Sequence, residues 1–245
     1  MRLRSIIIAG LTAVFASGAM YLVDYLMFRD TKQLLIQLVD DLAFIPISVF
    51  IVVVVLERLL NRQEKLLILN KLNMVIGAFF SEVGNTLIHR LLNSYGNNKE
   101  ISKSFSIDAS WTHDHFKSAI VASVSIASEP NGRAINFEDL KAFLANERQF
   151  LLNLLENPNL MEHDKFSDLL WAIFHLSEEL DARPSVADLS GPDIKHIEED
   201  IGRLYGQLIS QWLSYAEYLQ DKYPYLFSLT VRMNPFLSQP SAIIT

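Results

Sequence analysis

The sequence predicts an all-α protein, built as a two-helix transmembrane hairpin followed by a cytoplasmic α-helical bundle. Two long apolar runs fill most of residues 1–60, and apolar side chains recur at helical spacing through most of the remaining chain. The alternation typical of a strand occurs in one short stretch near the C-terminus. We therefore expect a hairpin in 1–60, a cytoplasmic helical domain in 61–224 and a C-terminal tail in 225–245.

The composition excludes several classes of protein. Half of the 245 residues (50%) are apolar, none is cysteine, and the formal net charge is −7. A chain without cysteine has neither disulfides nor a cysteine zinc site, and this apolar fraction is too high for a disordered or collagen-like chain.

The first expected span covers residues 6–28, whose only charged side chain is Asp24. As a helix this segment is about 34 Å long, which is enough to cross a hydrocarbon core of about 30 Å. A cleaved signal peptide is the alternative, because Arg2 and Arg4 form a basic start and small residues follow at 17–19. The apolar run continues well past that point, which favours a retained span.

The second expected span covers about 38–60 around the apolar core of 42–56. A buried helix of a soluble domain is the alternative. The four consecutive valines at 52–55 leave no polar face, and the first span is only a short loop away, so we expect lipid around both helices.

Basic residues set the expected orientation, because cytoplasmic flanks carry the excess of lysine and arginine. Arg29 and Lys32 lie in the loop between the spans. The flanks on the other side hold Arg2, Arg4, Arg58, Arg62, Lys65 and Lys71. The expected location is the cell inner (cytoplasmic) membrane, as a multi-pass protein with both termini in the cytoplasm.

Two sets of residues in the hairpin are candidates for a role in assembly. Small side chains recur every four residues at Ala9, Ala13 and Ser17, which permits close helix packing within the hairpin or in a homo-oligomer. Three carboxylates, Asp24, Asp40 and Asp41, fall at the expected outer boundary. They are either hydrated interface residues or an acidic vestibule that attracts cations in an oligomer.

Residues 59–92 carry apolar side chains at helical spacing and predict a long helix that leaves the membrane. Gly77 and Gly84 within it indicate a close helix crossing or a break. The segment 66–84, LLILNKLNMVIGAFFSEVG, resembles stretches of prokaryotic two-span membrane proteins that have no assigned function. The resemblance covers about a third of the chain, counting the preceding span, and implies no activity.

The following segments are expected to be helices separated by Pro, Gly and Asn turns. The predicted helices are 111–128, 137–156 with Asn136 as its N-cap, 161–182, and 193 to about 223. A β-like piece is expected at 227–231. The aromatic side chains expected in the core are Trp171, Phe174, Trp212, Tyr215 and Tyr218.

No familiar catalytic or nucleotide-binding motif is present, so we expect no catalytic or organic cofactor-binding residue. The best candidate metal ligands are His175 with Glu178 and His196 with Glu199, because positions three apart share a helix face. The order is the reverse of the Glu-x-x-His pattern of di-iron bundles, and solvated ion pairs are the alternative. His113-Asp114-His115 is expected to lie at a helix start, as exposed caps and a first-turn charge.

Residues 156–200 hold twelve Asp and Glu against three Lys and Arg, which argues against nucleic-acid binding. A basic cytoplasmic protein partner is permitted. The leading hypothesis is a non-enzymatic, homo-oligomeric protein of the lipid bilayer that acts in assembly, in sensing or as a channel. The alternative is a membrane-anchored protein that binds a metal ion through the histidine and glutamate side chains.

Overall fold

The computed structural model describes residues 2–29, 31–125, 130–131, 135–158, 160 and 164–243, with the backbone alone at 2–7, 9, 28, 33–34, 66 and 125. Every regular element in these ranges is a helix, which confirms the predicted all-α class. The α-helices are α1 (Arg2–Phe28), α2 (Thr31–Phe79), α3 (Asn85–Leu92), α4 (Asn98–Phe105), α5 (His113–Ser125), α6 (Phe137–Leu155), α7 (Asp164–Asp181), α8 (Gly191–Lys222) and α9 (Pro224–Arg232). A π-helix, η1 (Phe80–Gly84), joins α2 to α3.

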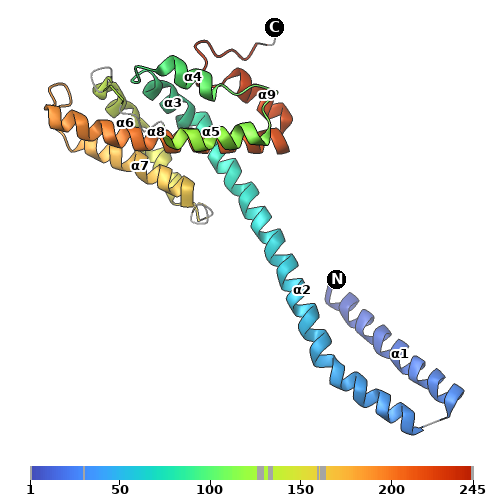
Figure 1. Ribbon diagram of the computed structural model, residues 1–245. Coiled ribbons are helices and arrows are strands. Elements are labelled where there is room, and N and C mark those ends of the chain that lie inside the picture. Colours follow the sequence, from blue (N-terminus) through green and yellow to red (C-terminus); the bar gives the residue numbers. More distant parts are fainter. Residues whose placement is uncertain are drawn as a thin grey trace. The chain divides into compact units, whose positions relative to one another are not determined.

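The chain divides into two compact units, Met1–Lys65 and Leu66–Thr245. In the first unit, α1 and the first part of α2 are the two arms of a hairpin (Figure 1). Arg29 ends α1 with a φ of 49°, and its N–H donates to the Tyr25 carbonyl at 2.9 Å. A left-handed residue at this position is a common helix stop.

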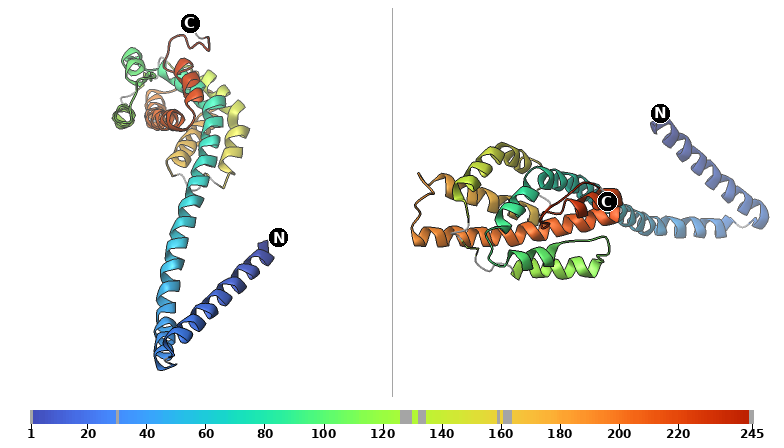
Figure 2. Two further views of the ribbon diagram at one scale, coloured as in Figure 1. Left: turned by 90° about the vertical axis from the view of Figure 1, so that its right-hand side faces the viewer. Right: turned by 90° about the horizontal axis from the view of Figure 1, so that it is seen from above.

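The second unit is organised around α8, which packs against α3, α5, α7 and α9 (Figure 2). The helix begins at the N-cap Ser190, whose hydroxyl accepts a hydrogen bond from the Asp193 N–H at 3.4 Å. Helix α6 packs on α7 and so forms an outer layer.

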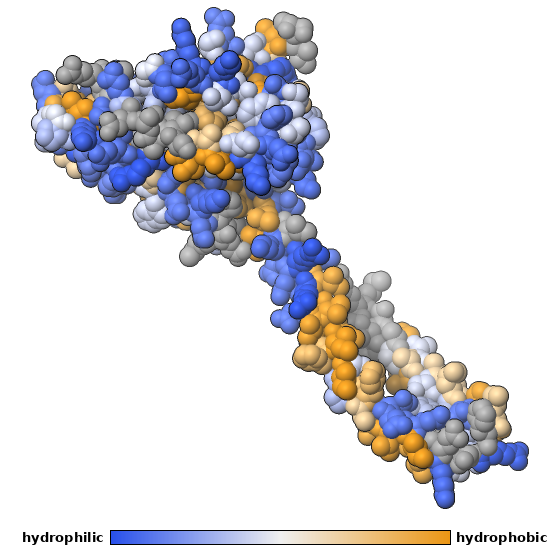
Figure 3. All heavy atoms as spheres, in the orientation of Figure 1, coloured by the Kyte–Doolittle hydropathy of each residue, from blue (hydrophilic) through white to orange (hydrophobic). Residues whose placement is uncertain are grey.

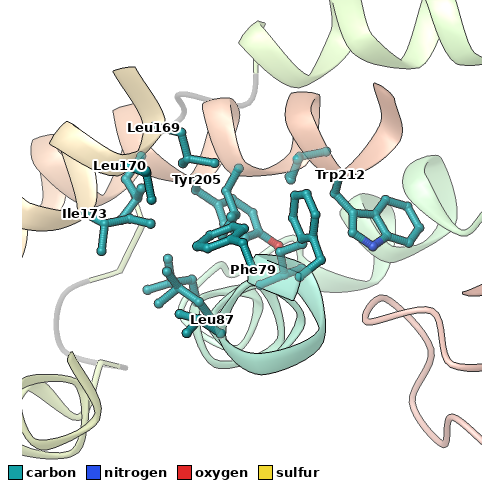
Figure 4. Packing of buried hydrophobic residues seen from close by; sticks show 14 of the residues in the cluster. Phe79, Leu87, Leu169, Leu170, Ile173, Tyr205 and Trp212 are labelled. Carbon is teal, nitrogen blue, oxygen red and sulfur yellow. The ribbon is translucent and has the colours of Figure 1, made fainter. Parts of the chain in front are cut away.

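The core of this unit lies where α3 and the end of α2 meet α7 and α8 (Figure 4). Phe79 packs edge-on against Phe166 with ring centroids 5.3 Å apart. Tyr205 and Trp212 on α8 are 0% and 1% exposed. Burial of a large side chain contributes about 1.5–3 kcal/mol, so these aromatic residues hold the helices of the second unit together.

The two glycines predicted to mark a crossing or a break do both. A Cβ at Gly77 would lie 2.6 Å from the Tyr215 hydroxyl oxygen, so glycine permits the close α2–α8 contact, and a larger residue would displace the Tyr215 side chain. Helix α2 then changes to the π-helix at Phe80, and the Asn85 N–H donates to the Phe80 carbonyl five residues back. Gly84 sits against the Phe79 and Phe80 rings, which leave no room for a side chain.

Several local predictions are confirmed. The Asn136 side chain accepts a hydrogen bond from the Asp139 N–H at 3.0 Å and caps α6. Helices lie at the four positions predicted, although residues 126–128 and 161–163 of the expected helices are outside the described residues.

The C-terminal segment corrects another prediction. Residues 227–231 are helical within α9, not β-like. Pro224 fits the first turn of a helix, and Phe227 is 6% exposed because it packs on α5 next to Phe116. Farther along, Phe236 is 2% exposed and contacts Trp212, so this segment belongs to the core of the second unit.

The prediction that Trp171 lies in the core is also wrong. Trp171 is 63% exposed on α7, whereas Phe174 and Trp212 are buried and Tyr215 and Tyr218 are partly buried against the core. The buried stripe of α7 runs through Leu169, Leu170 and Ile173, which places Trp171 on the opposite face.

Candidate metal centre

Three side chains with metal-binding atoms meet between α7 and α8. His175 comes from α7, and His196 and Asp200 lie one turn apart on α8. One ligand atom from each can be chosen so that all three lie within 4.8 Å of one another. No other group of three such side chains occurs in the described ranges.

Asp200 is the unusual member of the group because it is buried. It lies in the apolar stripe of α8 between Ile197 and Leu204, and its side chain is only 3% exposed. Arg203, three residues on, forms an ion pair with Oδ1. Within the part of the chain that the structure describes, no group donates a hydrogen bond to the buried Oδ2.

The unpartnered Oδ2 lies beside both imidazole rings. It is 3.4 Å from His175 Nε2 and 3.6 Å from His196 Nε2. In a tetrahedral zinc site with bonds of about 2.0–2.2 Å, neighbouring ligand atoms are about 3.3–3.5 Å apart. The two separations fit a bound divalent ion, and they fit direct ion pairs between Asp200 and protonated imidazoles as well. The histidine side chains are 53% and 47% exposed, which leaves a solvent-facing position open for water or another ligand.

Glu179 flanks the same site. Its Oε2 is 3.6 Å from His196 Nε2 and accepts a 2.8 Å hydrogen bond from Arg183. This hydrogen bond lowers the pKa of Glu179 and raises that of Arg183. Glu179 therefore stays ionised beside His196 and adds negative charge at the edge of the site.

The structure brings together the two predicted histidines but replaces both predicted glutamates. Glu178 and Glu199 are exposed, whereas the carboxylates beside the histidines are Glu179 and Asp200. Residues three and four positions apart both lie next to each other on a helix, so spacing does not distinguish the predicted glutamates from the carboxylates found beside the histidines. The sequence signal was the position of Asp200 in the apolar stripe, where a buried carboxylate requires a partner.

The predicted acidic residues of the hairpin also lie near one another. Asp24, Asp40 and Asp41 line a cavity of about 580 Å³ together with Ser17. The Tyr21 hydroxyl donates to Asp41 Oδ2 at 2.6 Å across the two arms.

Of the three small residues predicted to pack, Ser17 lines this cavity, and Ala9 and Ala13 are not among its lining residues. Ala13 is exposed. The side chain of Ala9 is outside those that the structure describes.

The third histidine group does not join the metal centre. His115 Nδ1 accepts a 3.0 Å hydrogen bond from the Thr112 N–H at the start of α5, which is the predicted capping role. His113 Nδ1 lies 2.5 Å from Glu217 Oε1 on α8.

Comparison with known proteins finds relatives for both units. The family described as "MJ1433, N-terminal helical domain" matches residues 2–60, and the one described as "Uncharacterized protein MJ1433, C-terminal helical domain" matches 68–232. The chain is 37% identical over 234 residues to "Uncharacterized protein MJ1433" of Methanocaldococcus jannaschii, covering 95% of this chain and 94% of the relative. No solved structure matches. These descriptions state a helical fold and assign no activity.

Proposed function

The chain belongs to the MJ1433 family, which has two helical parts, and on this premise we propose that it is an integral membrane protein. In this proposal residues 1–60 form a transmembrane hairpin in the inner membrane, and the second unit is a cytoplasmic helical domain. The hairpin supplies the anchor, and the helical domain supplies the binding chemistry.

The observation that supports this proposal is the exposure of large apolar side chains along both arms of the hairpin. Phe15 is 81% exposed, Phe50 is 68% exposed and Val53 is 53% exposed. Orange surface gathers over the arms on the face shown in Figure 3, whereas blue predominates over the second unit. Both arms are long and apolar enough to cross a membrane. Water-soluble proteins rarely expose so large a contiguous apolar surface, whereas lipid solvates it.

Arginine substitution in the second arm tests the anchor. A charge at the centre of a span costs about 2.5–3.5 kcal/mol of insertion, so Phe50→Arg with Val53→Arg should shift protein from the membrane fraction. Val121→Arg is the matched control, because Val121 is 67% exposed on α5 of the second unit. Full-length protein that stays soluble without detergent, or a C-terminal tag digested from outside intact cells, would contradict the proposal.

Homo-oligomerisation is part of the proposal, because two spans cannot enclose a pore and small side chains on α1 permit close packing. The mass of the detergent-solubilised particle tests it, with Ala13→Leu expected to reduce assembly. A wild-type monomer would remove both the oligomer and the channel version.

A second candidate function is binding of a divalent transition metal by the second unit. The buried, unpartnered Asp200 Oδ2 between two imidazoles supports it. Two histidines and one carboxylate with an open position form a common zinc donor set, and zinc is the ion we propose. Held there, the ion would link α7 to α8 and present an exchangeable position to solvent.

Zinc titration of the detergent-purified full chain, after chelator treatment, tests this function. Asp200→Asn keeps the shape of the side chain but weakens a ligand, and His175→Ala with His196→Ala removes two. Each should lower zinc affinity at least tenfold, whereas Glu178→Gln and Glu199→Gln should leave it unchanged. Loss of zinc binding on the glutamate substitutions alone would instead favour the ligand set predicted from the sequence. Absence of one-to-one binding by the unsubstituted protein would remove the metal function.

A further inference from the structure

The second unit contains a cavity on the side of α8 that faces η1 and α9, and its residues take no part in the metal centre. Its volume is about 520 Å³, within the range of small-molecule sites. The walls come from the end of α2, η1, the start of α3, α8 and α9.

The walls are mainly aromatic and aliphatic, with Ser81, Asn85 and Thr230 as polar members. Phe80 and Tyr215 stack with ring centroids 5.7 Å apart and an interplanar angle of 17°, and they form one wall with Trp212 close by. Leu229 and Met233, on the opposite wall, are 42% and 41% exposed. Covering these side chains with an apolar ligand would be favourable, and flexible methionine adapts to ligand shape.

One polar group in this wall lacks a partner. Asn85 Oδ1 is buried, and no described group donates a hydrogen bond to it. Asn85 lies at the end of the π-helix, and its N–H donates to the Phe80 carbonyl. An orphaned buried acceptor costs about 1–3 kcal/mol. A ligand hydroxyl or N–H would remove that cost once the Asn85 amide turns toward the cavity, because Oδ1 is not accessible to solvent where it lies. π-Helical turns are frequent at functional sites.

The charge of the wall restricts the ligand further. None of the described lining residues is charged. Burying an ionised group there would carry a large desolvation penalty, which argues against phosphates, carboxylates and metal ions.

We propose that this cavity binds a neutral amphiphile, a molecule with an apolar body and one hydroxyl or N–H donor that reaches Asn85. The donor pairs with Oδ1, and the apolar body lies between the Phe80–Tyr215 wall and α9. The proposal is independent of the metal centre and of the membrane orientation.

Photoaffinity labelling of the detergent-solubilised full chain tests the proposal. The probe is a medium-chain alcohol that carries a diazirine, compared with the matched diazirine carboxylate and the matched diazirine alkane. The alcohol should label peptides of α8 and α9 saturably, and unlabelled alcohol should compete. Labelling of these peptides by the carboxylate or the alkane should be several-fold weaker.

Two variants locate the site. Asn85→Leu should weaken labelling by roughly three- to tenfold, the value of a lost hydrogen bond. Asn146→Leu, the same change on the exposed face of α6, should not. Leu229→Trp should block the cavity from its rim, whereas Met74→Trp, at a residue 75% exposed outside the lining, should have no effect. Circular dichroism checks that each variant folds. Equal labelling by all three probes, or labelling unaffected by both cavity variants, would overturn the proposal.

Discussion

Several buried polar atoms have no hydrogen-bond partner among the described residues, and each such atom lowers the stability of the fold. Asp200 Oδ2 belongs to the candidate metal centre and Asn85 to the cavity wall, and in our proposals a ligand pairs with each atom. The hydroxyls of Tyr95 and Tyr205 are also buried without a hydrogen-bond partner among the described residues. Their rings stack with centroids 4.8 Å apart, so packing rather than hydrogen bonding holds them.

The tyrosine pair predicts an alkaline limit to stability. Burial raises the pKa of Tyr95 and Tyr205 above the ordinary value of about 10. Below pH 10 these tyrosines are protonated in both the folded and the unfolded protein, so their contribution to stability does not change with pH. Above it the unfolded state loses protons first, so the free energy of unfolding falls by about 1.4 kcal/mol per pH unit for each tyrosine.

Tyr95→Phe should therefore reduce the alkaline slope and, by removing an orphaned hydroxyl, stabilise the protein by about 1 kcal/mol. Thermal melting followed by circular dichroism between pH 8 and about 11 measures both effects. Tyr225→Phe, at a side chain 71% exposed, is the control. An unchanged slope in Tyr95→Phe would show that this hydroxyl ionises as freely in the folded state.

At the scale of elements, the crossing of α5 and α8 is close at Gly206. A Cβ at Gly206 would lie 3.0 Å from the Ser123 carbonyl oxygen, and a backbone atom cannot turn aside as a side-chain tip can. Gly206→Leu should therefore destabilise the second unit by about 1–3 kcal/mol through overpacking. Chemical denaturation measures the loss, with Gln207→Leu, at an exposed neighbour on α8, as the control. Equal stability of the two variants would mean that α5 moves freely.

Helix positions followed from periodicity and capping residues, as at Asn136, because these signals are local. Helix α9 could not be predicted in this way. Its Leu-Thr-Val-rich sequence has strand propensity, and the contact of Phe227 with Phe116 on α5 outweighs it. Helix α4 was not predicted for a different reason, since its two buried residues, Ile101 and Phe105, give too short a pattern to recognise.

The candidate metal centre could be predicted in part from the sequence. Helical spacing identified His175 and His196, but spacing alone does not say whether the carboxylate three or four residues along faces the neighbouring helix. That choice depends on how α7 and α8 rotate to bury Leu176 and Ile201, which is a property of the packed unit.

At the scale of the whole molecule, metal binding should appear as thermal stability of the second unit. An ion held between α7 and α8 binds the folded state alone, so zinc at 100 times its dissociation constant adds about 2.7 kcal/mol. For a domain of this size the melting temperature should rise by roughly 5–10 °C. A chelator should reverse the rise, and the His175→Ala and His196→Ala double variant should not show it. A similar rise in that variant would place the zinc elsewhere.

The outward position of Trp171 supplies an optical sensor for this centre. The indole lies one helical turn before His175 on the same face of α7, and both side chains are open to solvent. A paramagnetic ion such as Cu²⁺ at the imidazoles would quench the emission of Trp171 far more than that of Trp212, which the core shields from such contact. Red-edge fluorescence of a Trp111→Phe variant can thus follow occupancy with no attached dye. The substitution is needed because Trp111 lies beside His115, with ring centroids 6.2 Å apart, and would respond to copper bound there.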